Sequence, residues 1–130
     1  MLQLRYPRLW MLPGWILVVG VIVGSVIPDA PLRALNVTDD IMHASSYGVL
    51  MMWFAGLYAR NRQAWIALGV LTLGLAMEII QSRISYRTFD LFDLRANALG
   101  VLVGLAFSFW FLAGWCQRLE NWLMSRHAGH

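Results

Sequence analysis

Ionisable and polar side chains recur at helical spacing along this chain. Asp39, His43 and Tyr47 follow one another at intervals of four residues, so a helix places them on one face. Imidazole changes its charge between about pH 5 and 8, and a neighbouring carboxylate can orient the ring. Such a group transfers protons or binds a ligand by hydrogen bonds. The spacing therefore predicts a functional histidine at position 43, oriented by Asp39.

Further polar residues follow at spacings of three and four, with two arginines among them. Arginine holds phosphate and other anionic groups by paired hydrogen bonds, which we predict for Arg87. Glu78 lies inside an apolar run, where a carboxylate must pair, take up a proton or face a wet cavity. The candidate catalytic groups are His43, Glu78 and Asp93. The candidate binding residues are Asp39, Tyr47, Gln81, Arg87, Asp90 and Asn97.

The segments that must position these residues are strongly apolar. The chain is 59% hydrophobic and 13% charged, whereas a soluble domain carries about 25% charged residues. About 20 apolar helical residues cross a bilayer core, and only helices satisfy their own backbone within one segment there. We predict one domain over residues 1–130, an all-α integral membrane four-helix bundle. Its helices are expected at about 9–27, 41–59, 64–82 and 93–116.

The charges predict how these helices are oriented. Arginine is enriched on the cytoplasmic side of membrane proteins. With four spans, one side sums to +5 and carries Arg5, Arg8, Arg60, Arg62, Arg118 and Arg126. The other side sums to −1 and carries Arg33, Arg83, Arg87, Arg95 and all five aspartates. Both termini are therefore expected in the cytoplasm, and the polar candidates at the outer leaflet.

Composition and spacing also limit the partners and cofactors. The arginines lie between apolar runs, so we interpret the net charge of +3 as a determinant of orientation in a bilayer. No nucleic-acid partner is predicted. One cysteine, Cys116, excludes an internal disulfide and a cysteine-based zinc site. No cofactor and no metal site are predicted. The pairs Gly20/Gly24 and Gly100/Gly104 predict close helix contacts, either within the chain or between two copies.

Several candidates also have a purely structural interpretation. Asp39, Asp90 and Asp93 are suited to cap helix N-termini. Glu78 could form a structural pair with Arg83 or Arg87. His43 and Tyr47 could serve only as hydrogen-bonding contacts between helices.

Taken together, the polar positions resemble the VanZ-like family of bacterial membrane proteins. The resemblance rests on Asp39-x-x-x-His43-x-x-x-Tyr47, on Glu78-x-x-Gln81, and on a third motif that runs from Arg87 through Asp90, Asp93 and Asn97 to Gly100. The family usually has a lysine after the first aspartate, whereas this chain has Asp40. The resemblance implies a small protein of the cell envelope in the bacterial inner (cytoplasmic) membrane. It also implies a link to resistance to the glycopeptide teicoplanin.

Three functions remain open from the sequence. The first is a polar outer-leaflet pocket that binds an envelope lipid with an anionic headgroup, a lipid-linked precursor or an amphiphilic antibiotic. The second is a membrane enzyme that acts on a lipid-linked headgroup. The third is a structural or accessory subunit in which the polar residues only hold the helices together.

Overall fold

Every regular element of the described chain is helical, as the sequence predicts. The computed structural model describes residues 1–27, 38–85, 89–112 and 114–127. The α-helices are α1 (Pro7–Val26), α3 (Asp39–Leu57), α4 (Gln63–Gln81), α5 (Leu91–Phe107) and α6 (Trp115–His127). A 3₁₀ turn, η1 (Arg60–Arg62), leads into α4, and a π-helical turn, η2 (Ser108–Leu112), follows α5.

Three helical stretches are long and apolar enough to cross a membrane. They are Pro7–Val26, Arg60–Gln81 and Leu91–Leu112. These stretches are typical of a membrane protein. The fourth expected span, 41–59, does form a helix, but α3 is not among the three. It starts with Asp39 and Asp40 and carries polar residues in its first turns.

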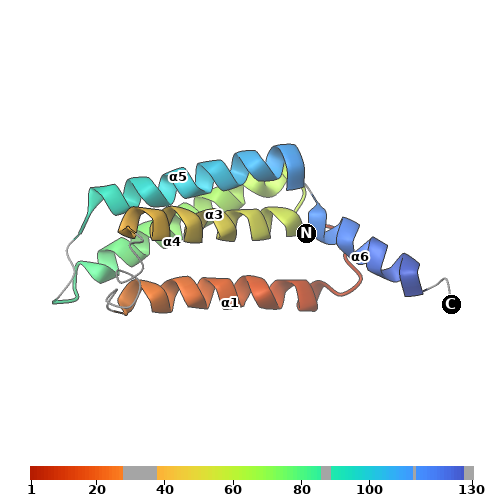
Figure 1. Cartoon of the computed structure of the whole chain (residues 1–130), viewed down its shortest axis with the longest axis horizontal. Coiled ribbons are helices and arrows are strands. Elements are labelled where there is room, and N and C mark those ends of the chain that lie inside the picture. Colours follow the sequence, from red (N-terminus) through yellow and green to blue (C-terminus); the bar gives the residue numbers. More distant parts are fainter. Residues whose placement is uncertain (28–37, 86–88, 113, 128–130) are drawn as a thin grey trace.

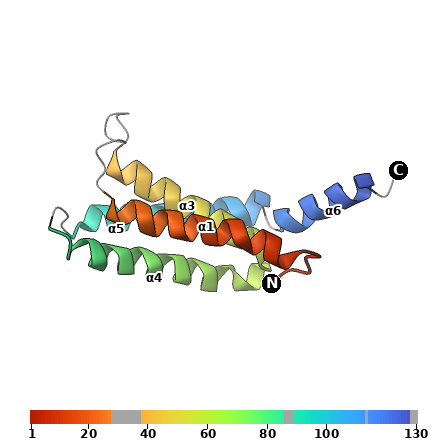
Figure 2. The ribbon, with the colours of Figure 1, turned by 90° about the horizontal axis from the view of Figure 1, so that it is seen from below.

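Helix α3 is instead the most enclosed element of the structure. Tyr47, Leu50, Met51, Ala55 and Leu57 are each at most 1% exposed. Helices α1, α3, α4 and α5 run along the long axis of the molecule with alternating direction (Figures 1 and 2). One end of the molecule therefore collects the end of α1, the start of α3, the end of α4 and the start of α5. Helix α6 projects beyond the opposite end.

Glycines bring the backbones of α3 and α5 into direct contact. A Cβ atom on Gly48 would lie 3.2 Å from the carbonyl oxygen of Gly100, and one on Gly104 would lie 2.6 Å from that of Gly48. A Cβ on Gly100 would meet the carbonyl oxygen of Ala44. Gly100 and Gly104 thus form a seam within the chain, whereas Cβ atoms on Gly20 and Gly24 would have nothing within 4 Å.

The last expected helix ends earlier than predicted. Helix α5 starts at Leu91, where the side chain of Asp90 accepts the amide of Phe92 at 2.7 Å. It passes into the π-helical turn and does not continue to residue 116. Gly114 has a φ of 67°, a left-handed conformation that ends a helix, and α6 starts at Trp115. Arg60 and Arg118 donate to the carbonyl oxygens of Phe109 and Phe111 in this turn.

A buried carboxylate joins α6 to the start of α1. Glu120 accepts hydrogen bonds from the amides of Arg5 at 2.6 Å and Tyr6 at 3.1 Å, and from the indole of Trp10 at 3.0 Å. Amides at a helix start have no partner within the helix, so a carboxylate suits this place. Trp10, Trp53 and Trp115 pack together beside it, with ring centroids 5.2–6.4 Å apart.

The seam predicts a specific glycine dependence. Gly100→Ala should lower the free energy of unfolding by about 1–3 kcal/mol, because the new methyl group must push α3 away from α5. Gly69→Ala is the matched control, since a Cβ there would have nothing within 4 Å. Thermal unfolding in detergent measures both. Equal melting temperatures for the two variants would contradict the close backbone contact.

The Glu120 contact predicts an acid-sensitive connection. Burial raises the pKa of Glu120, but hydrogen bonds from Arg5, Trp10 and Tyr6 outweigh it and hold the pKa below its ordinary 4.5. A carboxylate with a lowered folded-state pKa stabilises the fold above about pH 4.5, and this stabilisation is lost as pH falls through the folded-state pKa. Wild type should therefore melt higher than Glu120→Gln at pH 7, and the difference should shrink below pH 4.5. A pH-independent difference would show that the charge has no part.

Candidate functional site

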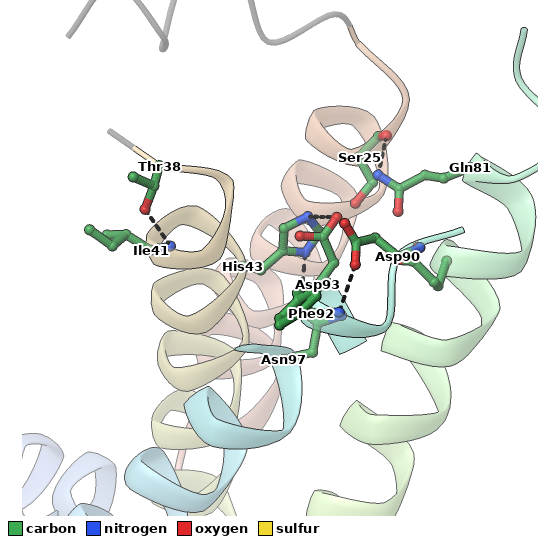
Figure 3. A network of polar contacts seen from close by, with 10 residues as sticks. Ser25, Thr38, Ile41, His43, Gln81, Asp90, Phe92, Asp93 and Asn97 are labelled. Atoms are coloured by element: carbon green, nitrogen blue, oxygen red, sulfur yellow. Dashed lines mark hydrogen bonds and ion pairs between the residues drawn. The ribbon is translucent and has the colours of Figure 1, made fainter. Parts of the chain in front are cut away.

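A histidine on α3 is held between two polar side chains of α5 (Figure 3). His43 Nδ1 lies 3.0 Å from Asn97 Oδ1, and His43 Nε2 lies 3.5 Å from Asp93 Oδ2. Asp93 and Asn97 are four residues apart and share one face of α5. We call these three residues the His43 cluster. Its geometry depends on the glycine seam one turn further along, which lets α3 and α5 approach this closely.

Burial and polar contacts fix the orientation of the histidine. The side chains of His43 and Asp93 are 11% and 15% exposed, and Asn97 is 1% exposed. Both ring nitrogens lie beside side-chain oxygen atoms of α5. Asp93 and Asn97 therefore hold the imidazole ring from one side.

Glu78 supports this cluster from α4. Its side chain is 1% exposed, and its Oε1 accepts the backbone amide of Asp90 at 2.6 Å. Asp90 in turn caps the helix that carries Asp93. Glu78 therefore anchors the first turn of α5. The alternative of a structural pair between Glu78 and Arg87 concerns an arginine outside the described residues.

Two polar atoms in this core have no hydrogen-bond partner among the described residues. They are Glu78 Oε2 and the hydroxyl of Tyr47, a side chain that is 1% exposed. A Cβ on Gly74 would lie 3.2 Å from both Tyr47 Cε1 and Asn97 Nδ2. Tyr47 and Asn97 thus pack against α4 one turn before Glu78. Unsatisfied buried groups of this kind are places where a water molecule fits.

The His43 cluster borders a groove between α1 and α3. The groove has a volume of about 540 Å³, and α1 supplies an apolar wall that includes Ile16, Leu17 and Val21. The polar residues that line it are Ser25, Asp39, His43, Ser45, Ser46, Tyr47 and Gln81. A polar wall therefore faces an apolar one, as the binding of an amphiphile requires.

The predicted site residues are only partly brought together. Asp93 and Asn97 on α5 contact the two ring nitrogens of His43. The orientation of the ring by Asp39 stays a prediction. Asp39 lines the groove. The alternative that Asp39 caps α3 is wrong, because Thr38 is the N-cap residue and its side chain accepts the amide of Ile41 at 3.4 Å.

The other candidates have separate places. Asp90 does cap α5, as one alternative predicted, and Asp93 lies in the first turn of that helix. Gln81 donates to the carbonyl oxygen of Ser25 at 2.9 Å, which ties α4 to α1. Arg87 lies outside the described residues, so its role as an anion-binding group stays a prediction.

Sequence reasoning missed the residues that let the site form. Gly48 and Gly74 leave room for the α5 backbone and for the Tyr47 and Asn97 side chains. Each of these glycines lies within one helical turn of a predicted polar site residue, and this proximity in the sequence could have identified them as part of the site. Ser25 contributes through its carbonyl oxygen, which no residue type can indicate.

Comparison with known proteins gives one informative match. A curated protein of Schizosaccharomyces pombe (strain 972 / ATCC 24843), named "Uncharacterized protein C11E3.10", is 30% identical to this chain over 119 residues. The match covers 88% of this chain and 71% of that protein. No family model and no solved structure matches the chain.

The ion pair in the His43 cluster predicts an energetic coupling. In a double-mutant cycle, His43→Gln and Asp93→Asn should couple by about 0.5–3 kcal/mol in the free energy of unfolding, because the two side chains contact each other. Glu120→Gln is the matched control, since Glu120 contacts the start of α1 at the opposite end of the molecule. Its coupling to His43→Gln should be near zero. Additive effects for the first pair would refute the contact.

Proposed function

This chain belongs to the same family as the S. pombe protein C11E3.10, and from that premise we propose that it is a membrane protein that binds an amphiphile. The ligand is an envelope lipid, a lipid-linked precursor or an amphiphilic antibiotic. It lies in the groove between α1 and α3, with its polar headgroup among the polar lining residues around His43 and its apolar part along α1. The protein holds the ligand without chemical conversion.

The observation that carries this proposal is the position of His43. The residue is fixed by Asp93 and Asn97 on one side and lines the groove on the other. The apolar wall of the groove continues into exposed residues, and Ile16 is 60% and Val49 42% exposed. A lipid can thus enter from the side, while the polar wall selects its headgroup. This combination is typical of ligand sites, where few polar groups fix the orientation of an apolar ligand.

The contacts of the histidine favour binding over catalysis. A general base needs a free nitrogen within hydrogen-bond reach of the proton that it removes. In the His43 cluster, both nitrogens already face acceptors. Ser45 is no better placed as a nucleophile, because its hydroxyl donates to the carbonyl oxygen of Met42 at 3.1 Å. An enzyme that acts on a lipid-linked headgroup therefore remains the second candidate, supported only by the contact between His43 and Asp93.

The proposal includes an arrangement in the membrane. Helices α1, α3, α4 and α5 cross the bilayer as a four-helix bundle, with α3 shielded from lipid by its neighbours and both termini in the cytoplasm. Six arginines at one end support this orientation: Arg5, Arg8, Arg60, Arg62, Arg118 and Arg126. The VanZ-like resemblance, a bacterial cytoplasmic membrane and a link to glycopeptide resistance are further parts of the proposal.

Filling the groove tests the proposal without disturbing the His43 cluster. Gly20 lines the groove, and a Cβ there would have nothing within 4 Å. Gly20→Leu should fold normally and lose most of the lipid that co-purifies with wild type, measured by mass spectrometry of the protein extracted with native lipids. Gly69→Leu, on α4 and outside the groove, is the matched control and should keep that lipid.

The outcomes separate the candidate functions. Equal retention of the lipid by wild type and Gly20→Leu would refute the groove as the binding site. Conversion of the lipid by wild type, and its loss in His43→Gln, would identify an enzyme instead. Loss of folded protein in His43→Gln, with no lipid on wild type, would support a structural subunit.

A further inference from the structure

The opposite end of the molecule carries a second and larger groove. It has a volume of about 790 Å³ and lies where the start of α1 meets α3 and α6. Its walls are mostly aromatic and aliphatic. The lining residues are Arg5, Tyr6, Leu9, Trp10, Pro13, Trp53, Glu120, Leu123 and Met124.

The groove spans the depth at which a membrane changes from headgroups to acyl chains. Arg5 and Tyr6 directly precede α1, which is one of the three helical stretches that can cross a membrane. Pro13 lies six residues into that stretch, or about 9 Å deeper at 1.5 Å per residue. The charged rim therefore lies at headgroup level and the apolar wall at acyl-chain level. Leu9 is 66% exposed, so this wall is open to lipid.

One cation, Arg5, and one carboxylate, Glu120, line this groove. Glu120 already accepts three hydrogen bonds from the start of α1, and the charge of Arg5 adds to their effect in lowering the pKa of Glu120. The guanidinium of Arg5 contacts Met124 Sδ at 3.9 Å and lies 5.7 Å from the centroid of the Tyr6 ring. Neither contact is an ion pair, so N–H donors of Arg5 are left for a ligand. The further arginines of this end add to the attraction for anions.

We infer that this groove is a second lipid site, which binds an anionic phospholipid of the adjoining leaflet. The phosphate contacts the Arg5 guanidinium, and one acyl chain lies along Leu9, Trp10, Pro13 and Leu123. The Glu120 contact positions the site, because it holds the start of α1 against α6. This inference needs α1 to enter the membrane, but it does not depend on the groove beside His43.

Tryptophan fluorescence provides the test, because Trp10 and Trp53 line the groove. The full chain is placed in phosphatidylcholine nanodiscs that contain a small fraction of lipid with brominated acyl chains. Brominated phosphatidylglycerol should quench wild type more strongly than brominated phosphatidylcholine at the same mole fraction. Arg5→Gln should weaken the binding of phosphatidylglycerol about tenfold, as expected for the loss of a charge-assisted hydrogen bond.

Arg8→Gln is the matched control. It removes the same charge three residues further along the chain, and the side chain of Arg8 does not line the groove. Arg5→Gln should also fold, because Arg5 reaches Glu120 through its backbone amide. Selective loss in Arg5→Gln supports the site. Equal loss in both variants would mean general surface charge, and equal quenching by both lipids would mean no headgroup selection; either result overturns the inference. Soluble glycerol 3-phosphate should not compete, and if it does, a free phosphate is the ligand and the lipid site is rejected.

Discussion

The close contact between the backbones of α3 and α5 is the constraint on which the rest of the structure depends. Gly48, Gly100 and Gly104 remove the side chains that would keep two helices at their usual distance of 8–10 Å. Where lipid replaces water, helix association depends on such packing, because burial of apolar side chains gains little. One turn from this seam, the same closeness brings His43 within reach of Asp93 and Asn97. The polar site is therefore a consequence of glycine packing.

The sequence predicts the helices better than it predicts their contacts. Apolar runs mark α1, α3, α4 and the start of α5 to within two residues, because each run of apolar residues forms one helix. The end of α5 was misplaced, since Phe109 to Leu112 remain apolar while the backbone changes to a π-helical turn. Helix α6 was missed because the sequence between Leu112 and Trp115 is too short to mark a break in the apolar run.

In the candidate site too, the sequence predicts which residues share one helix face better than it predicts contacts between helices. The spacing of four residues correctly groups Asp93 with Asn97, which both contact His43. It did not predict that Asp93 and Asn97 contact His43, because spacing within one helix carries no information about which neighbouring helix faces the ring. Glu78 was identified as a buried carboxylate, yet its partner is a backbone amide, and every residue type except proline carries one. The residue type at position 90 therefore could not predict this contact with Glu78.

Helix α1 contacts α3 closely near Gly14, and one groove lies on each side of that contact. A Cβ on Gly14 would lie 2.9 Å from Trp53 and 3.0 Å from Phe54, so the helices touch closely near this point. Before it, the groove that Arg5 and Trp10 line is tied down by Glu120. Beyond it, the groove beside His43 is bordered by Gly20 and Gly24, and the contact of Gln81 with Ser25 holds the end of α1 against α4. If both proposals hold, α1 is fixed at its two ends and at one middle point and admits a lipid at each interval between them, and the charged residues beside each interval select the headgroup.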